Sequence, residues 1–342
     1  MRPLAAARRH RVPYDVAMNG MNETRPFTVY MSQEGHASVD KAMSLLGMGR
    51  KHLRRISVND DLRVNIPALE RAIDEDRKSG CIPICVVGVA GSTNTGAIDP
   101  LENLATVCQA NGLWLHVDAA YGGPAAGTGS AGALFRGLER ADSVTVNPHK
   151  WLYVPPEIGC ILVRDRLALK QTFEVTADYL REGDTNAQAQ LDFKDYGPQL
   201  TRSFRALKMW MTFKAYGAKQ LRASIESNIE IMQYLARRID ESEDFALMAP
   251  APLSVVCFQY RTLDPKRHGD AEYLNDLNGR LADALERDGR VFVSATSLRG
   301  KRVLRACSVN HRLTREDVEC LLSVSREIGR VLEVSGPSTA CK

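Results

Sequence analysis

The first half of the chain alternates between helix-like and strand-like patterns of apolar residues. Residues 66–78 place Leu69 and Ile73 one helical turn apart, which predicts a short helix. Residues 82–90 form a continuous apolar run, which is typical of a strand buried on both faces. Strands alternating with helices in this way indicate a mostly parallel sheet with helices on both faces. The same reading predicts a helix over 101–111 and strands over 113–119, 143–146 and 159–163.

The pattern changes after about residue 245 and predicts a smaller α+β unit there. The expected elements of the second half, after a loop-rich stretch over 166–205, are helices over 206–216, 221–240, 271–288 and 315–331 and strands over 254–260, 291–295 and 303–309. We therefore expect four parts: an N-terminal helix or linker over 1–30, a large domain over 31–240, a small C-terminal domain over 245–334 and a tail over 335–342.

The N-terminal residues 1–12 carry four arginines and no acid. An organelle transit peptide has such a composition, but this segment is short and poor in serine. We favour an amphipathic helix over residues 4–10 that opens the fold.

Composition excludes several classes of protein. The 342 residues include 45 Lys+Arg and 41 Asp+Glu, a net charge of +4, and 44% are hydrophobic. That supply of apolar residues argues against a disordered chain. We find no dense basic stripe of the kind that binds nucleic acid, and no apolar run of the roughly 20 residues that a membrane span needs. We therefore expect neither a nucleic-acid partner nor a membrane.

The eight cysteines form no Cys-x-x-Cys pair. Cys81 and Cys85 lie four residues apart inside an apolar run, which favours buried thiols over a metal site. Unpaired thiols are typical of a reducing compartment, so we expect the cytoplasm and no metal.

Three polar or glycine-rich segments directly follow predicted strands, namely residues 91–94, 118–123 and 147–150. Ligands of open α/β sheets bind beyond the carboxyl ends of the strands, so these segments are expected to meet at one crevice.

Two of these segments carry charged residues that suit cofactor chemistry. Lys150 follows Asn147-Pro148-His149, and an amine there can form a Schiff base with an aldehyde. Asp118 ends another strand, and a buried acid needs a cationic partner such as a protonated pyridine nitrogen. Singly, a lysine is usually a solvated charge and a strand-end aspartate usually a cap or surface ion pair. Together with His36 and Thr93, each in its own motif, they predict a pyridoxal phosphate site.

The motifs resemble one known family. The segments HVDAAYGG and NPHKW at residues 116–123 and 147–151 closely resemble the pyridoxal-phosphate-dependent group II amino acid decarboxylases, which include aromatic-amino-acid, histidine and glutamate decarboxylases. The resemblance covers most of residues 25–330 and continues through GHASVDKA (35–42), GSTNTGAIDP (91–100) and RSFRALKMW (202–210).

This resemblance implies a fold-type-I, aminotransferase-like α/β architecture with pyridoxal 5′-phosphate bound in the large domain, and a homodimer with sites at the interface. Lys150 would form the Schiff base, Asp118 would keep the pyridine nitrogen protonated, and His36 would stack on the ring. The other implied contacts are Ala120 on the opposite ring face, Thr93 near the ring hydroxyl, and Asn147 and His149 near the phosphate.

The implied reaction is the decarboxylation of an L-amino acid to its amine and CO₂, which makes the protein a lyase of the carboxy-lyase type. Aromatic substrates are the first expectation, because RSFRALKMW and NPHKWL resemble that branch of the family.

Two departures from the family pattern keep alternatives open. Relatives carry a Ser-Gly-Gly-Ser-type phosphate loop ahead of the position of Met1, and here only Gly20 and Gly35 precede His36. We expect that the chain begins just after that loop, as a truncated product, a fragment or a mis-assigned start. An inactive homologue that acts by dimerising is therefore one alternative.

The second departure lies in LDFKDYG, residues 191–197, which resembles the family's catalytic loop. Phe193 falls where many aromatic-amino-acid decarboxylases have a proton-donating tyrosine, and phenylalanine has no proton to donate. Family members with phenylalanine there include aldehyde synthases, so an aromatic aldehyde synthase is a further alternative. Tyr196 or a water could instead supply the proton.

Overall fold

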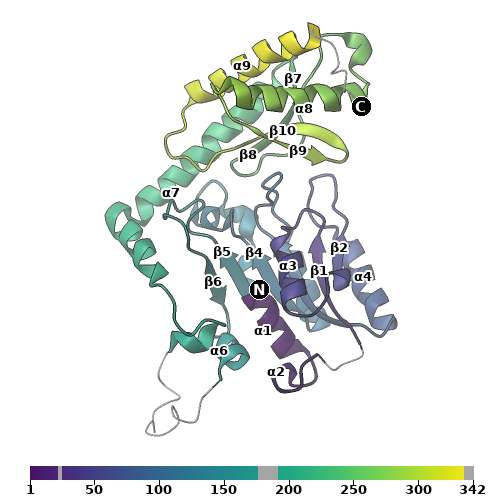
Figure 1. Ribbon diagram of the computed structural model, residues 1–342, viewed down its shortest axis with the longest axis vertical. Helices are drawn as coiled ribbons and strands as arrows, with labels where there is room; N and C mark the ends of the chain where they lie inside the picture. Colours follow the sequence, from purple (N-terminus) through teal and green to yellow (C-terminus); the bar gives the residue numbers. More distant parts are fainter. Residues whose placement is uncertain (22–24, 176–191, 335–342) are drawn as a thin grey trace.

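The computed structural model describes residues 1–21, 25–175 and 192–334, and Figure 1 shows its two sheets one above the other. The larger sheet has six strands in the order β2-β1-β3-β4-β5-β6, all parallel except β6, which pairs antiparallel with β5. Its strands are β1 (Phe27–Ser32), β2 (Leu53–Ile56), β3 (Ile82–Val89), β4 (Trp114–Asp118), β5 (Ser143–Val146) and β6 (Cys160–Val163).

Helices cover both faces of this sheet, each over its own hydrophobic core. Apolar residues of α4 and α5 pack on one face, and those of α1 and α3 pack on the other. The helices of this part are α1 (Arg2–Arg11), α2 (Val16–Asn19), α3 (Ser38–Leu45), α4 (Ile66–Lys78), α5 (Leu101–Asn111) and α6 (Ala168–Phe173). The predicted mostly parallel α/β architecture is confirmed.

The smaller sheet is antiparallel, with the strand order β7-β8-β10-β9. The second half of α7 packs with α8 and α9 against one of its faces around a third core. The elements are α7 (Arg205–Asp240), β7 (Phe245–Leu247), β8 (Val255–Tyr260), α8 (Ala271–Asp288), β9 (Ser294–Leu298), β10 (Lys301–Cys307) and α9 (Arg315–Val334). The predicted smaller α+β unit is confirmed.

Short 3₁₀ turns connect these elements, at η1 (Arg50–His52), η2 (Gly123–Gly127), η3 (Gly132–Phe135), η4 (Leu138–Arg140), η6 (Phe193–Tyr196) and η7 (Pro265–Arg267). The predicted helices over 66–78 and 101–111 match α4 and α5 residue for residue. Asn65 caps α4 by accepting the Ala68 N–H, and Gly112 ends α5 in a left-handed conformation.

One expectation about the elements was wrong, and three strands were missed. The strand expected over 291–295 lies at 294–298, where the polar sequence SATSL pairs with β10. The two helices expected over 206–216 and 221–240 are confirmed: α7 covers both ranges, and a non-helical residue, Gly217 with φ 73°, separates its two halves. Sequence reasoning did not find β1, β2 or β7. Part of the loop-rich stretch, residues 176–191, and the tail over 335–342 lie outside the described residues.

A buried carboxylate fastens the end of β3. The side chain of Asp99, 3% exposed, accepts the backbone N–H of Val64 at 2.7 Å and that of Val89 at 2.8 Å. Burial raises the pKa of Asp99 to about 6. The hydrogen bonds from the two N–H groups lower the pKa and offset only part of this rise. The charged form is therefore disfavoured in the folded protein.

This carboxylate predicts a pH-dependent stability. Between about pH 4 and pH 6 the folded state keeps a proton that the unfolded chain releases, so the free energy of unfolding falls as pH rises. Relative to Asp99→Asn, we expect the wild-type value to fall by about 3 kcal/mol between pH 4 and pH 7. Urea unfolding at several pH values measures this difference. The exposed Asp61→Asn variant serves as control, and a wild-type–D99N difference that is constant with pH would contradict the assignment.

Candidate active site

The carboxyl ends of β1, β3, β4 and β5 open on one cavity of about 290 Å³. This volume is near the lower end of the range for small-molecule sites, roughly 300–1,000 Å³. Its walls come from the turns after these strands and from the start of α1. Six of the seven predicted site residues line it: His36, Thr93, Asp118, Ala120, Asn147 and Lys150.

Glycines let the turns after β3 and β4 pack against each other. Gly91 has φ 99°, and a Cβ on it would lie 2.9 Å from the backbone of Gly122. A Cβ on Gly122 would lie 2.4 Å from the carbonyl oxygen of Ala90. The segments that carry Thr93 and Asp118 can therefore approach only because both positions lack a side chain.

Asp118 is held by its own turn and leaves one oxygen facing the cavity. Its Oδ1 accepts the Ala120 N–H at 3.1 Å. Among the described residues, no lysine or arginine forms an ion pair with this carboxylate. A cationic group on a ligand would supply the partner that a half-buried carboxylate requires.

The turn after β5 places Lys150 opposite. Asn147 donates its N–H to the carbonyl of Ala120 at 3.1 Å, and Lys150 donates its N–H to the carbonyl of Asn147 at 2.9 Å. These bonds connect the turn of Lys150 to Ala120, in the turn that follows Asp118. The ammonium of Lys150 has no hydrogen-bond or salt-bridge partner in the described part of the chain, so it is available to a ligand.

His36 lies on the turn between β1 and α3. Its Nδ1 accepts the N–H of Ser38 at 3.2 Å, which leaves the proton of the neutral imidazole on Nε2. The turn is tight, since a Cβ on Gly35 would overlap the side chain of Met31. The side chain is exposed at the mouth of the cavity, where an imidazole can cover a flat ligand.

His116 also lines the cavity, although sequence reasoning assigned it no role. Burial lowers its pKa to about 4, so the imidazole is neutral at physiological pH. Its Nδ1 donates to the carbonyl of Ser143 at 3.1 Å, and Thr145 donates its hydroxyl to Nε2 at 3.3 Å. The available signal was strand periodicity, because His116 lies two residues before Asp118 and shares its face of β4.

The C-terminal part of the chain closes one edge of the site. Arg305 of β10 donates its Nε–H to the carbonyl of Thr93 at 2.8 Å. The next residue, Asn94, donates its amide to Glu34 at 2.9 Å and accepts the hydroxyl of Thr296 at 3.0 Å. Thr93 therefore stays in place through contacts to both sheets.

Two residues singled out from the sequence lie elsewhere. His149 does not line the cavity, and its Nδ1 donates to the carbonyl of Ile158 at 2.5 Å. Phe193 does not line it either, with 63% of its side chain exposed. Leu191, in the same loop motif, lies outside the described residues.

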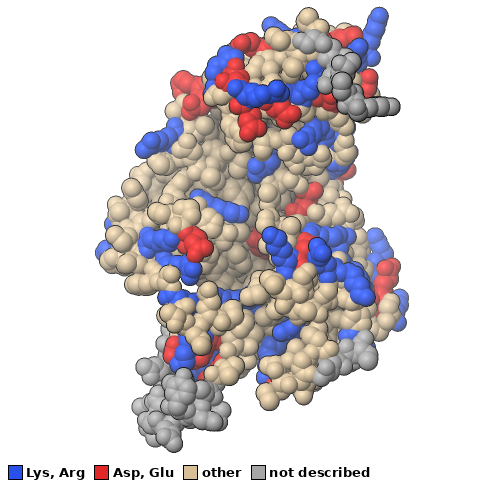
Figure 2. All heavy atoms as spheres, viewed as in Figure 1, with Lys and Arg blue, Asp and Glu red and all other residues tan. Residues whose placement is uncertain are grey.

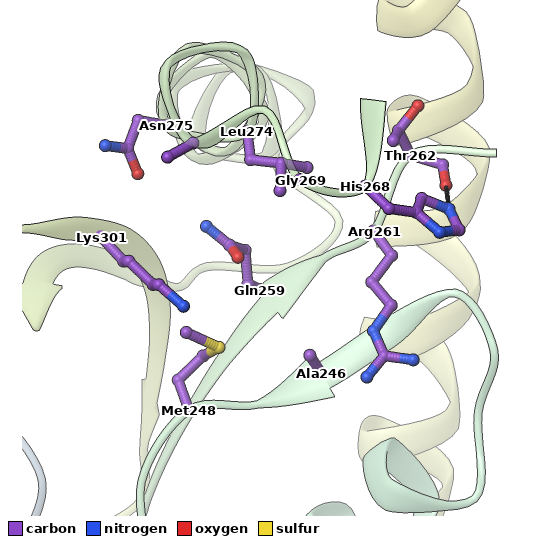
Figure 3. Close-up of a pocket in the computed structure, with 11 residues that line it drawn as sticks. Ala246, Met248, Gln259, Arg261, Thr262, His268, Gly269, Leu274, Asn275 and Lys301 are labelled. Carbon is purple, nitrogen blue, oxygen red and sulfur yellow. Dashed lines mark hydrogen bonds between the residues drawn. The ribbon is translucent and has the colours of Figure 1, made fainter. Parts of the chain in front are cut away.

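A second hollow, of about 420 Å³, opens on the smaller sheet (Figure 3). Arg261 and Lys301 line it, but no carboxylate does, and His268 is occupied by a 2.8 Å hydrogen bond to the carbonyl of Thr262. It has a lysine but no acid to act with it, so we assign the chemistry to the first cavity.

Other kinds of site find no support in the described ranges. No cluster of three or more His, Cys, Asp or Glu side chains there could hold a metal ion. No helix in the same ranges combines the length and apolarity that crossing a bilayer requires. On the face shown in Figure 2, basic and acidic side chains are interspersed.

Comparisons with known proteins point to one family. The conserved-domain profile of pyridoxal-dependent decarboxylases matches residues 4–261. An aromatic-L-amino-acid decarboxylase of Bacillus atrophaeus is 34% identical over 93% of this chain and 66% of its own length. A phenylacetaldehyde synthase of Petunia hybrida is 32% identical over 84% of this chain and 58% of its own length.

A solved structure agrees with these matches. The Oryza sativa TDC, crystallised with PLP and tryptamine, superimposes with a TM-score of 0.89 at 27% identity, over 96% of this chain and 68% of that one. The chain spans between 58% and 66% of the length of the two curated relatives.

Proposed function

Because this chain belongs to the pyridoxal-dependent decarboxylases, we propose that the protein converts an L-amino acid to its amine and CO₂, with aromatic amino acids as the favoured substrates. One observation carries the proposal. The carboxylate of Asp118 and the amine of Lys150 face one cavity at the ends of β4 and β5, and within the described ranges neither forms a salt bridge with another side chain. The aromatic preference is supported by the relatives, which include decarboxylases of aromatic amino acids, tyrosine and tryptophan.

The residues of the cavity fit pyridoxal 5′-phosphate. When bound, this cofactor supplies a ring that accepts the electron pair released as CO₂ leaves. Lys150 would hold it through the amine, and Asp118 would hold a proton on the ring nitrogen. The imidazole of His116 is neutral, so it adds no positive charge beside Asp118.

The remaining residues would hold the ring and its substituents. His36 and Ala120 would contact its two faces, and Thr93 would lie near the ring hydroxyl. Asn147 lines the cavity and would lie near the phosphate. His149 would reach the phosphate only through Nε2, because Nδ1 is bound to Ile158.

We also propose a division of the chain and its setting. Residues 31–240 would form the cofactor-binding domain and 245–334 the small domain. The cytoplasm is the proposed location, since all seven cysteines in the described ranges are free thiols.

The first test is the visible absorption spectrum of the purified chain with added pyridoxal phosphate. We expect an absorption band that is absent from Lys150→Ala, because Lys150 is the one lysine among the described residues that line the cavity. Circular dichroism checks that the variant is folded. A folded wild-type chain that shows no Lys150-dependent band would contradict the proposed function.

An aromatic aldehyde synthase is the second candidate, and two observations favour it. Phe193 occupies the position implied for the proton-donating tyrosine, and phenylacetaldehyde synthases are among the relatives. We expect the amine and CO₂ as products in assays with aromatic L-amino acids. Aldehyde, ammonia and hydrogen peroxide would instead establish the synthase, and they are measured on the same samples.

We further propose that two copies of the chain associate. The first half of α7 lies at the outer edge of the molecule (Figure 1) and exposes large apolar side chains that nothing in the described part covers. They are Phe204, Leu207, Trp210, Met211 and Tyr216. Several large apolar side chains exposed at the start of one helix favour a protein interface there.

Sedimentation velocity tests this association. We expect a dimer in the wild type. The double variant Phe204→Glu/Trp210→Glu, which places two negative charges at the start of α7, is expected to be a monomer. A monomeric wild type at micromolar concentration would contradict the proposal.

A further inference from the structure

The turn that follows Lys150 contains a backbone conformation that must be held from outside. Tyr153, three residues after the lysine, has φ 56°, in the left-handed region that bulky side chains rarely adopt. Such a residue persists only where its surroundings fix it, and such residues concentrate at functional sites. Its ring meets His311 edge-on at 5.4 Å, and its hydroxyl donates to Asn228 at 2.8 Å.

Asn228, in the second half of α7, is the centre of these contacts. Only 1% of it is exposed. Its Oδ1 accepts both the Tyr153 hydroxyl and the indole N–H of Trp151, the latter at 3.1 Å. Its Nδ2 donates to the carbonyl of Asn310 at 2.7 Å. The side chain of Asn228 therefore connects Trp151 and Tyr153, which both follow Lys150, to the loop after β10.

Trp151 is held from a second side as well. Its ring stacks on Tyr121 with centroids 4.9 Å apart and an interplanar angle of 10°. The Tyr121 hydroxyl is 2.5 Å from Ser254 Oγ and accepts the Ser254 N–H at 3.1 Å. Because Tyr121 follows Ala120 directly, this stack also connects the lysine turn to the turn of Asp118.

We propose that Asn228 and Tyr153 are positioning residues that hold the Lys150 turn in its working geometry and couple it to the smaller sheet. Neither residue lines the cavity, so they act through the backbone of residues 150–153. The coupling runs through Asn310 and Ser254, which flank β10 and β8. This inference rests on the proposed role of Lys150 and adds to it the residues that fix the amine.

A purely structural role for Asn228 makes a different prediction. In that case its loss would lower the stability of the fold and leave the reactivity of Lys150 unchanged. The chain offers a matched control in Asn278, a fully buried asparagine of α8. It accepts the Tyr260 N–H at 2.8 Å and donates to the carbonyls of Tyr260 at 3.0 Å and Leu274 at 2.9 Å. It therefore makes three hydrogen bonds, as Asn228 does, but in the core of the smaller sheet.

The experiment compares wild type, Asn228→Ala, Tyr153→Phe and Asn278→Ala in two measurements. Without cofactor, the rate at which an amine-reactive reagent labels Lys150 is followed by mass spectrometry of its peptide. With pyridoxal phosphate, the dissociation constant is obtained from the Lys150-dependent visible band. We expect Asn228→Ala and Tyr153→Phe each to change the labelling rate of Lys150 by roughly fivefold or more and to raise the dissociation constant by a similar factor. A change of this size is typical of the loss of a buried hydrogen bond. Asn278→Ala should stay within about twofold of wild type in both, although it lowers the unfolding midpoint.

Each outcome decides the proposal. If Tyr153→Phe and Asn228→Ala match wild type, or if Asn278→Ala changes both quantities equally, the positioning role is wrong. Should Asn228→Ala not fold, Tyr153→Phe decides, because it removes a single hydroxyl. If the wild type shows no visible band, the proposed function fails, and the cofactor-free labelling still tests the positioning role.

Discussion

The site depends on one constraint, which is that neighbouring parallel strands end at the same edge of their sheet. Strands β1, β3, β4 and β5 run in the same direction, so the residues after them meet although they are far apart in the sequence. His36, Thr93, Asp118 and Lys150 each follow or end one of these strands. The chemistry therefore requires the strand order and not any single motif. The glycines after β3 and β4 matter because they bring these strand ends into contact.

The smaller sheet completes this arrangement from the other side. Arg305 holds the carbonyl of Thr93, Ser254 holds Tyr121, and Asn310 meets the amide of Asn228. The first two contacts reach the turns after β3 and β4 directly, and the third reaches the turn after β5 through Asn228. A change in the position of the smaller sheet would therefore move the turns of Thr93, Asp118 and Lys150 together.

Sequence reasoning predicted the parts of the fold whose signals are local. Helices α4 and α5 were predicted with their exact bounds, because a helical pattern is followed closely by a glycine in both cases, Gly80 and Gly112. Strand β1 was missed even though all six of its residues are buried, because short apolar runs do not distinguish a strand from a helix. Strand β9 was shifted because its residues are polar and it is fixed by pairing with β10. The same limit applies to the site. The motif residues could be predicted, whereas Asn228 could not, since its contacts come from segments about 75 and 82 residues away.

The electrostatics of the cavity restrict what can bind there. His116 is neutral, so it leaves the carboxylate of Asp118 in need of a cation. Lys150 offers an amine on the opposite turn, with no carboxylate paired to it. A ligand that satisfies both groups must carry a protonated nitrogen at one end and a group that reacts with an amine at the other. A pyridine ring that bears an aldehyde has this polarity, whereas a nicotinamide or a simple carboxylate does not. This cavity suits pyridoxal phosphate because an acid and an amine face it together, and among the described residues neither forms a salt bridge with a side chain.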